Sequence, residues 1–566
     1  MTKINEVHVI RSSLWAAYGD AVGFPTELIS AAEFKKRNAM PAVSKPIAWR
    51  RRVGGLFGPE VEFPEGTYSD DTQLRLSTSR AITGSGFFDV ESFAKIELPV
   101  WLNYALGAGR GSKAAATNLA LRESSWSLNF FSAGDAKYWE GGGNGAAMRI
   151  QPHVWQNHNS PRHAFVSDVL RNSVCTHGHP RALIGAVIHA AMLFETMHSG
   201  KPIPPSDWAD LGEALGHIAL DVLEADPELP LVWIPSWERL AKRSLREAWL
   251  NTIGEWHQAS NVAAGICARG SLGPAEIYAA VLKELGAFEA SERGSGLKTP
   301  LYASVAAWLF RDHAPEIALA TVANFFGSDT DTIATMAGAL IGAVADSEPS
   351  TPIQDELYIR SEASRMFYIG HKEHERSFEY PDLLSWNAPR SHSDAWLSDA
   401  DGERLAGIGM IQPFGPTYKS KKGTELVWQW ADLEFGQTVL VKRRAAQVST
   451  SKSSAEREAS RRNAAPAGKK LLGGNSGDVL KSQKALVSDE TQMPLIEDVS
   501  SLDAVDFQPP SSQYIDALTQ QCIRGGFDPR EIGSAMLSLM TGPHAIERAI
   551  AFAAIIAKAK VVRSAK

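Results

Sequence analysis

Cysteine is scarce in this sequence. Its 566 residues include three cysteines, Cys175, Cys267 and Cys522, which lie far apart along the chain. No CxxC pair occurs, and no Cys/His group has the spacing of a zinc site. These absences exclude a disulfide scaffold and a zinc cluster, and they favour a protein that works in the reducing cytoplasm. A cytoplasmic location is therefore our expectation.

Long apolar runs and a strong charge of either sign are also missing. No uninterrupted run of about 20 apolar residues occurs, so we expect no membrane span. The opening residues, MTKINEVHVIRSSLWAAYGDA, lack the apolar core of a signal peptide. The net charge of −7 is mild for this length, and it gives no general attraction to nucleic acids or anionic membranes.

Helical periodicity dominates the first 350 residues. Apolar residues recur at a spacing near 3.6, as in segments 181–197 and 275–288, and the breaks between such segments are rich in glycine and proline. A hydrophobic fraction of 44% allows a sizeable core. We predict an all-α domain over residues 1–350, with its functional site on loops and helix starts.

The pattern changes after residue 350. A further helix is expected at 355–368, and a strand-rich segment follows, in which Leu426, Trp428 and Trp430 alternate with other residues. The run QTVLVK after Gly436 is typical of a β-hairpin. We predict a connecting helix and a small β-containing module over residues 351–445.

The last part of the chain combines a linker with more helices. Residues 446–510 are basic at first and then acidic, with many small residues and few aromatics, which predicts a flexible linker. The basic part lacks interleaved aromatic residues, so a solvated tether is favoured over nucleic-acid contact. Residues 511–566 are expected to form helices at 512–524, 529–540 and 543–562, with Asp528 as the cap and Pro529 at the start of the second.

Two acidic stretches precede apolar helical patterns. The first, YSDDTQL, contains Ser69, Asp70 and Asp71, and the second, GSDTDTIATMAGA, contains Asp329 and Asp331. Hard divalent cations take oxygen ligands from carboxylates and hydroxyls. A helix N-terminus partly offsets clustered negative charge. If the two stretches meet in the fold, their four carboxylates could hold two dications.

Each acidic stretch also has a simpler interpretation. Serine, threonine and aspartate are ordinary helix caps, and either stretch alone is better explained as one. The doubled Asp-Thr of the second stretch exceeds what a single cap requires. The metal interpretation therefore gains its weight from the set of motifs that follows.

Five segments, taken in order, resemble the motifs of the ADP-ribosylglycohydrolase family. They are LWAAYGDAVGFPTE (14–27), GTYSDDTQL (66–74), GGGNGAAMRIQP (141–152), CTHGHPRALIGA (175–186) and GSDTDTIATMAGALIGA (327–343). The ordered set is specific, whereas any one piece would be weak. The resemblance covers roughly residues 8–346, and nothing after about 370 resembles the core of the family.

The resemblance implies an all-helical, orthogonally packed catalytic domain with a binuclear magnesium centre in a cleft; manganese is the alternative metal. Carried over position by position, the implied metal ligands are Ser69, Asp70, Asp71, Asp329, Asp331 and Thr332. Ser69 stands where many members have threonine, and it keeps the hydroxyl oxygen. In this interpretation the C-terminal extension, with its small β-rich module and terminal helices, is additional to the family fold.

The family cleaves the N- or O-glycosidic bond between ADP-ribose and a modified side chain. Hydrolysis at an anomeric carbon develops oxocarbenium character, and a carboxylate can protonate the leaving atom or activate water. The resemblance implies Asp70, Asp71 and Asp331 as candidates for orienting that water. Glu27 is a further catalytic candidate, since it matches a family glutamate that lies near the metals in some members and acts as a mobile gate. Without the resemblance, a surface carboxylate at a helix end is an equally good interpretation of Glu27.

The same resemblance implies a set of substrate-binding residues. Gly143, Asn144 and Gly145 lie in a loop whose glycines allow the backbone to approach a pyrophosphate closely, although a plain glycine-rich turn is the alternative. His177 stands where the family histidine contacts ligand. Ser328 stands where the family usually has glycine, and it adds a Cβ beside the metal loop that could affect the approach to ribose.

Nearby residues have more ordinary expected roles. Met148 and Arg149 are expected to be structural, with Arg149 bonding loop carbonyls, and His179 can cap the next helix. Arginine-specific members place an acidic residue just upstream of the Asn-Gly pair. The nearest one here is Glu140, and its register does not match. The acceptor linkage, whether arginine, serine or a nucleic-acid base, therefore stays open.

The sequence as a whole predicts a magnesium-dependent hydrolase that removes ADP-ribose from a modified protein, so the expected partners are an ADP-ribosylated protein and the ADP-ribose product. One alternative is a module that binds ADP-ribose or a nucleotide without turnover, but retention of all four carboxylates argues for activity. Another is an interaction protein whose extension, residues 351–566, docks a protein partner. A membrane is not expected as a partner, and nucleic acid is not favoured.

Overall fold

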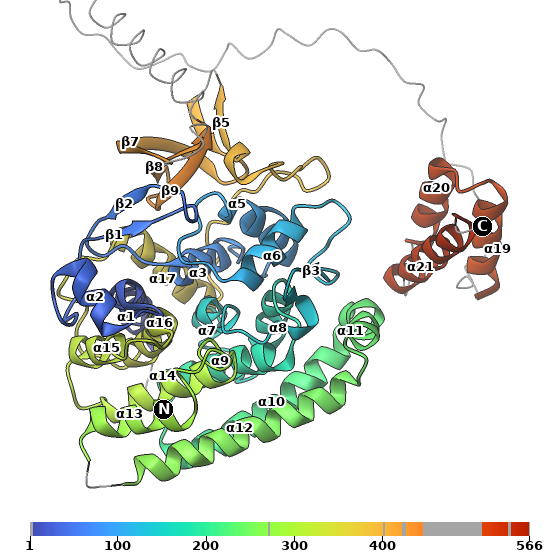
Figure 1. The fold of residues 1–566 in the computed structure, drawn as a ribbon. Helices are drawn as coiled ribbons and strands as arrows, with labels where there is room; N and C mark the ends of the chain where they lie inside the picture. The colour runs from blue at the N-terminus through green and yellow to red at the C-terminus, as the bar shows by residue number, and fades with distance from the viewer. Residues whose placement is uncertain are drawn as a thin grey trace, which may run out of the picture. The chain divides into compact units, whose positions relative to one another are not determined.

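The computed structural model describes residues 4–269, 272–399, 402–420, 426–444, 512–540 and 545–564. The chain divides into two compact units, Met1–Pro466 and Ala467–Lys566, and each is described here by itself. The first unit is mostly helical and carries a small antiparallel sheet formed by its C-terminal strands (Figure 1). The linker predicted for residues 446–510 lies outside the described residues.

Helices make up most of the first unit. They are α1 (Glu6–Gly23), α2 (Ala31–Asn38), α3 (Asp70–Arg80), α4 (Val90–Ser92), α5 (Leu98–Trp101), α6 (Arg110–Leu119), α7 (Gln151–Trp155), α8 (Val166–Val174), α9 (Pro180–Ser199), α10 (Trp208–Ala225), α11 (Ile234–Ala241), α12 (Leu245–Cys267), α13 (Pro274–Glu284), α14 (Lys298–Leu309), α15 (Pro315–Ala323), α16 (Thr330–Gly342) and α17 (Glu356–Gly370). The helices expected at 181–197 and 355–368 are α9 and α17. The one expected at 275–288 is α13, which ends at Glu284.

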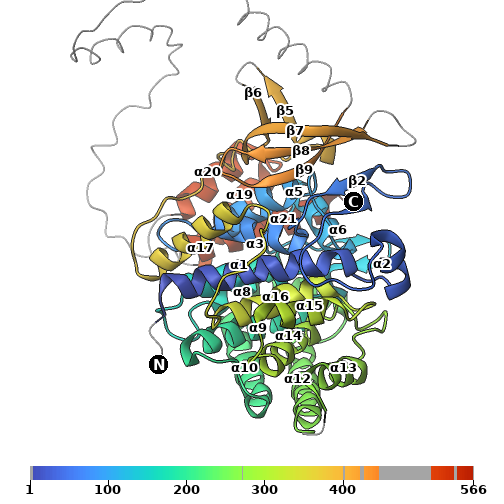
Figure 2. The same cartoon turned by 90° about the vertical axis from the view of Figure 1, so that its left-hand side faces the viewer.

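Glycines bring the first and the sixteenth helix unusually close together. α1 lies along α16 (Figure 2). A Cβ on Gly19 would lie 2.1 Å from the Ala334 carbonyl oxygen, and one on Gly338 would lie 2.2 Å from the Trp15 carbonyl oxygen. No other residue type fits such an approach, because any side chain would collide with backbone atoms. The contact fixes where α16 begins, and that end of the helix carries Asp329 and Asp331.

Helix α9 forms the centre of the helical core. It is long and apolar enough, with a mean hydropathy of 1.3, to cross a membrane by length and composition alone. However, 83% of that apolar window is buried inside the protein. It is surrounded by other helices, including α7, α8, α10, α12, α14 and α16, as expected for a helix that is hydrophobic on all sides.

The strands of the described residues form three small antiparallel sheets. The hairpins are β1 (Trp49–Arg52) with β2 (Glu60–Phe63), and β3 (Ser132–Ala133) with β4 (Ala136–Lys137). The third sheet is a meander of β5 (Trp396–Asp399), β6 (Gly402–Leu405), β7 (Gly409–Lys419), β8 (Leu426–Leu433) and β9 (Thr438–Arg444), paired in sequence order. The hairpin expected after Gly436 is the β8–β9 pair, and Gly436 itself adopts φ +100°, which favours glycine.

The meander packs against the helical domain rather than standing apart from it. Trp428 and Trp430 of β8 join Trp49 and Phe63 of the β1–β2 hairpin in one buried apolar cluster. On the other side, Gln437 reaches the core and accepts a hydrogen bond of 2.7 Å from Arg80 of α3. The meander therefore shares buried surface with the helical domain at two places.

The second unit consists of three helices in its described part, α19 (Ser512–Arg524), α20 (Pro529–Leu539) and α21 (Ala545–Ser564). Asp528 caps α20 by accepting from the backbone N–H groups of Arg530 and Glu531, with Pro529 in the first turn, as the sequence predicted. Together with the helical domain and the meander, these helices confirm the predicted fold class.

Buried neutral histidines make the fold sensitive to acid. Burial lowers the pKa of His189 in α9 to about 3, and Arg75 adds to the effect. The unfolded chain therefore binds a proton at His189 from about pH 6.5 downward, whereas the folded chain does not until about pH 3. The contribution of neutral His189 to the free energy of unfolding is therefore fully present above pH 6.5. It is lost as the pH falls from about 6.5 to about 3.

We expect His189→Met to reduce the pH dependence of stability. Between pH 6 and 4.5, the slope of the unfolding free energy against pH should fall by about 1.4 kcal/mol per pH unit, the contribution of one titrating group. Urea unfolding at several pH values measures this slope. An unchanged slope would show that His189 takes up its proton in the folded state as readily as in the unfolded one.

Candidate metal centre and substrate cavity

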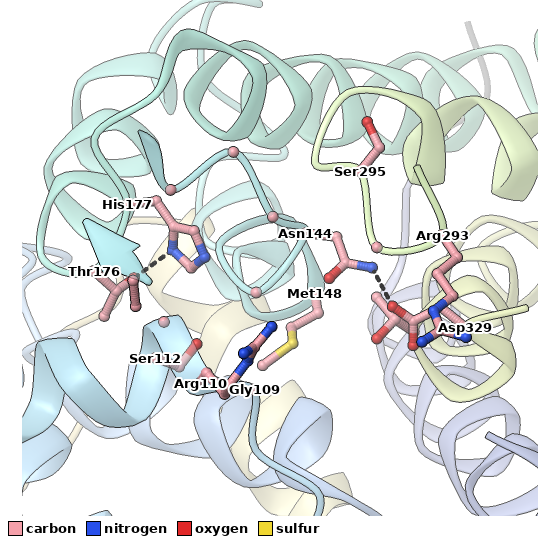
Figure 3. A pocket seen from close by; sticks show the side chains of 18 of the residues that line it. Gly109, Arg110, Ser112, Asn144, Met148, Thr176, His177, Arg293, Ser295 and Asp329 are labelled. Carbon is pink, nitrogen blue, oxygen red and sulfur yellow. Dashed lines mark hydrogen bonds between the residues drawn. The ribbon is translucent and has the colours of Figure 1, made fainter. Parts of the chain in front are cut away.

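One cavity brings the sequence-predicted residues together. It has a volume of about 670 Å³, within the range of roughly 300–1,000 Å³ typical of small-molecule sites. Its lining includes Glu27, Asp70, Asp71, Asp329, Asp331 and Thr332, and also Gly141–Gly145, Thr176, His177 and Arg293–Ser295. Figure 3 shows Asn144, His177 and Arg293, which belong to this lining. Segments some 300 residues apart in sequence thus face the same space.

The first acidic pair occupies the first turn of α3. Ser69 caps this helix, since its hydroxyl accepts from the Asp71 N–H at 3.2 Å and donates to the Asp71 carboxylate at 3.1 Å. Asp20, fully buried in α1, accepts from the backbone N–H groups of Ser69 at 2.8 Å and Thr72 at 2.9 Å. A carboxylate on α1 therefore fixes the backbone that presents Asp70 and Asp71.

The second acidic pair begins α16. Asp329 is the cap residue of this helix, but its side chain makes no capping hydrogen bond. Instead, its carboxylate accepts from the Asn144 side chain at 2.8 Å (Figure 3), and the same Asn144 amide donates to Thr299 at 3.2 Å. The Asp331 carboxylate accepts from the Thr332 N–H at 2.9 Å. The glycine-rich loop and the acidic loop are thus joined by a hydrogen bond at the site.

Glu27 lies between the two acidic pairs and the β1–β2 hairpin. One oxygen each from Glu27, Asp329 and Asp331 lies within 4.8 Å of the others, close enough to share a metal ion. On its other side Glu27 forms an ion pair of 3.5 Å with Arg51. The next residue, Leu28, has φ +55°, a conformation rare for leucine, and its N–H donates to the Ser328 carbonyl at 3.1 Å.

Burial and mutual repulsion raise the pKa of the cavity carboxyl groups. Removal from water is the largest cause in each case. It raises the pKa of Glu27 to about 7 and those of Asp70, Asp71 and Asp331 well above the usual range. Asp329 also raises the pKa of Asp71, and Asp71 raises that of Asp331. The two acidic stretches therefore act on each other within one site.

These carboxylates fit a hard divalent cation. Every donor in the cluster of Glu27, Asp329 and Asp331 is a carboxylate oxygen, the ligand type of Mg²⁺ and Mn²⁺. Asp71 adds a buried Oδ1 that has no hydrogen-bond partner among the described residues. An ionised oxygen left in this way is costly unless a cation neutralises it. The N-termini of α3 and α16 favour the remaining negative charge.

The opposite wall is shaped by glycines and a neutral histidine. A Cβ on Gly145 would lie 2.9 Å from the Ser112 hydroxyl and 3.1 Å from His177 Cε1, so any larger residue would narrow the cavity. His177 is buried, and burial, helped by Arg149, lowers its pKa to about 3. Its Nδ1 lies 2.8 Å from the Thr176 hydroxyl (Figure 3), which orients the ring. His177 can therefore exchange a hydrogen bond with a ligand, but it carries no charge near neutral pH.

Several nearby residues take the ordinary roles that the sequence suggested. Arg149 donates to the Gly145 carbonyl at 3.0 Å and to the Asn172 carbonyl at 2.9 Å, so it supports the loop. His179 caps α9 by accepting from the Arg181 N–H at 3.1 Å.

Two of the expected site residues use their hydroxyls elsewhere. That of Ser69 bonds within the helix cap, and that of Ser328 donates to the Phe325 carbonyl at 2.8 Å. Metal ligation by Ser69 and ligand contact by Ser328 stay predictions.

The structure adds residues that the sequence did not single out. Asp20 supports the start of α3, and its signal was a lone charge inside the apolar run LWAAYGDAVG. Arg293 lines the cavity beside Asp329, and its positive charge lowers the pKa of that carboxyl against the larger effect of burial. Arg51, which meets Glu27, comes from a hairpin that carries none of the recognised motifs. The roles of Arg293 and Arg51 become visible only in the folded structure.

Comparison with known proteins identifies the helical part of the chain. The ADP-ribosylglycohydrolase family profile matches residues 9–348. Among solved structures, a chain described as an ADP-ribosylglycohydrolase-related protein complex is similar at 21% identity, with a TM-score of 0.39; the match covers 65% of this chain and 100% of that one. A comparison with curated proteins gave no match. Because the family match spans more than half of the sequence, the chain belongs to the ADP-ribosylglycohydrolase family.

Proposed function

We propose that this protein is a magnesium-dependent hydrolase that cleaves the glycosidic bond between ADP-ribose and a modified protein side chain. Family membership supports glycohydrolase activity in general. The observation that carries the finer proposal is the convergence of five carboxylates, from Glu27 and the two acidic pairs, on a cavity with a glycine-rich opposite wall. Such a cavity suits a sugar held near cations and a diphosphate held near backbone.

The carboxylates would hold the metal ions. Glu27, Asp329 and Asp331 form one candidate group, and Asp70 and Asp71 extend it. Bound divalent ions would neutralise this cluster and fix and polarise the ribose hydroxyls. Asp20 positions Asp70 and Asp71 by holding the start of α3.

Proton transfer requires a group that can change its protonation state near neutral pH. Water that attacks the anomeric carbon must lose a proton, and the departing nitrogen or oxygen of the acceptor must gain one. We assign both tasks to Glu27, whose pKa burial raises to about 7: it would accept the proton from water and then pass it to the departing nitrogen or oxygen. Asp70, Asp71 and Asp331 orient the water. Neutral His177 and the Gly143–Gly145 loop would hold the ADP-ribose.

The proposed substrate of the protein is an ADP-ribosylated protein, the proposed product is ADP-ribose, and the proposed location is the cytoplasm. The three cysteines are few and unpaired in the structure, which favours the reducing cytoplasm. Lys137 and Glu140, which form an ion pair of 2.9 Å, line the cavity close to the loop that would hold ADP-ribose, so they are available to contact the acceptor.

A panel of ADP-ribosylated substrates tests the proposal. We expect magnesium-dependent release of ADP-ribose from at least one of two protein linkages, arginine or serine, and we include a nucleic-acid base as the third substrate of the panel. Asp329→Ala should reduce release by at least about a thousandfold, because it removes both a cation ligand and the partner of Asn144. Release is followed by chromatography of free ADP-ribose.

The outcomes separate the candidate functions. Binding of ADP-ribose without release from any linkage would favour a binding module. Release that persists in EDTA would contradict the role of the metal, and release from the nucleic-acid substrate alone would contradict a protein acceptor.

A further inference from the structure

Arg51 is in contact with the candidate catalytic carboxylate. It lies in β1, and its Nη1 is 3.5 Å from Oε2 of Glu27. The guanidinium also stacks over the ring of Phe24, with 4.8 Å to the ring centroid. Phe24 belongs to the 3₁₀ turn, Phe24–Thr26, that leads directly into Glu27. Arg51 therefore holds both the Glu27 side chain and the turn that carries it.

A continuous stack of aromatic rings fixes the position of Arg51. Phe24 packs edge-on against Trp49 at 5.2 Å between centroids, and Trp49 packs against Phe63 at 5.1 Å. Phe63 in turn packs against Trp430 of β8 at 5.8 Å. The series runs from the β5–β9 sheet, through the β1–β2 hairpin, to the turn before Glu27.

The β5–β9 sheet holds the β1–β2 hairpin by two further contacts. The Trp430 indole N–H donates to the Glu62 carbonyl at 3.2 Å. The Trp428 ring lies so close to Gly54 that a Cβ there would be 2.3 Å from it. The hairpin has only two strands, and such a pair is marginally stable without a packing partner. β1 and β2 lie beneath β8 and β9 (Figure 1), so the sheet supplies that partner.

We propose that Arg51 is a positioning residue for Glu27 and that the β5–β9 sheet braces it. The inference rests on the proposed function of the cavity. The family profile matches residues 9–348, so the β5–β9 sheet lies outside the matched part, and the inference gives that sheet a role. Glu27 faces Asp329 and Asp331, whose like charges push its carboxylate outward. The fixed cation of Arg51 opposes this repulsion and keeps Glu27 within reach of the site.

A double-mutant cycle tests the link between Arg51 and Glu27. We expect Arg51→Gln to lower kcat about tenfold, with a KM change below about twofold, and to weaken Mn²⁺ binding about threefold or more; these sizes are typical of directly coupled residues. In a Glu27→Gln background the same substitution should change either quantity by less than about twofold. Arg51→Lys keeps the charge but loses the guanidinium that stacks over Phe24, so it should recover only part of the loss in kcat.

The brace is tested with two buried tryptophans of the same sheet. Trp430 touches the hairpin, whereas Trp396 packs against Arg443 within the sheet, with 4.2 Å from the guanidinium carbon to the ring. Trp430→Leu should lower kcat and weaken Mn²⁺ binding in the direction of Arg51→Gln, and both changes should vanish in the Arg51→Gln background. Trp396→Leu should leave both quantities within about twofold, measured well below the unfolding temperature of each variant.

Two readouts keep the inference separate from the proposed function. Mn²⁺ binding, followed by electron paramagnetic resonance, reports the cycle even if no substrate is hydrolysed. If Arg51→Gln changes Mn²⁺ binding equally with and without Glu27, or leaves it unchanged, Arg51 does not act through Glu27. If Trp396→Leu matches Trp430→Leu, the sheet contributes only general stability and the brace is wrong.

Discussion

Replacing Asp331 by asparagine is expected to stabilise the protein without divalent cations and to abolish its activity with them. Asp331 is 3% exposed, and burial together with the charges of Glu27, Asp71 and Asp329 raises its pKa well above the usual range. Asparagine has the same shape and no charge. In EDTA the substitution removes an acidic group whose ionisation burial and the neighbouring charges oppose, so the unfolding temperature should rise.

Cations should reverse the order of stability. A ligand that binds only the folded state stabilises it by about 2.7 kcal/mol at a concentration of 100 Kd. The unaltered protein should gain this in millimolar Mg²⁺ or Mn²⁺, and Asp331→Asn should gain much less, because a shared ligand is lost. ADP-ribose release should fall by at least about a thousandfold, or about 4 kcal/mol of transition-state stabilisation.

Thermal unfolding in EDTA and in Mg²⁺ measures both effects. Asp168→Asn is the matched control, since burial raises the pKa of Asp168 to about 6, yet Asp168 lies outside the cavity. Its effect on the unfolding temperature should be the same in both buffers. If Asp331→Asn also shifts by the same amount with and without cation, the carboxylate cluster does not bind metal.

The local features of this site were accessible from sequence because each depends on a few neighbouring residues. Asp70 and Asp71 precede an apolar helical pattern, and so do Asp329 and Asp331, so both pairs could be placed at helix starts. That the pairs meet followed from their resemblance to family motifs, not from periodicity. The structure supplies the physical cause: α1 packs closely on α16 through glycines, and Asp20 of α1 holds the start of α3.

Contacts between residues far apart in the sequence could not be predicted in this way. Arg51 reaches Glu27 from a separate hairpin, and nothing in the run WRRR distinguishes Arg51 from Arg50 or Arg52. The alternation of side chains along β1 determines which arginine reaches Glu27. Arg50 faces outward and pairs with Glu62 across the hairpin, whereas Arg51 faces inward. Ser69 shows the reverse case. Its hydroxyl suits both a cap and a metal ligand, and sequence alone does not choose between them.

A second large effect is expected at Arg80, which ties the β5–β9 sheet to the helical core. Arg80 in α3 donates two hydrogen bonds to Glu97, at 2.7 and 2.8 Å, and one of 2.7 Å to Gln437 in the β8–β9 turn. Tyr380 donates to the same Glu97 carboxylate at 2.7 Å. The side chains of Arg80 and Glu97 are 1% and 0% exposed, so water cannot replace a lost partner.

We expect Arg80→Met to lower the unfolding free energy by about 3–5 kcal/mol, the range for a buried ion pair that loses one member. Methionine fills similar space, but it leaves the Glu97 charge buried with little compensation. The double variant Arg80→Met with Glu97→Leu should recover much of this loss, because an apolar pair of similar volume carries no unpaired charge. Urea unfolding of the single and double variants gives the comparison.

An exposed ion pair provides the control for this prediction. Arg50 and Glu62, with side chains 70% and 60% exposed, lie 3.3 Å apart on the β1–β2 hairpin. Arg50→Met should cost between 0 and about 1 kcal/mol, as is usual for surface pairs. If Arg80→Met costs no more than Arg50→Met, the buried pair does not hold the extension. If it costs the expected amount, the β5–β9 sheet and the helical domain should unfold together, because Gln437 binds Arg80 and Tyr380 binds Glu97.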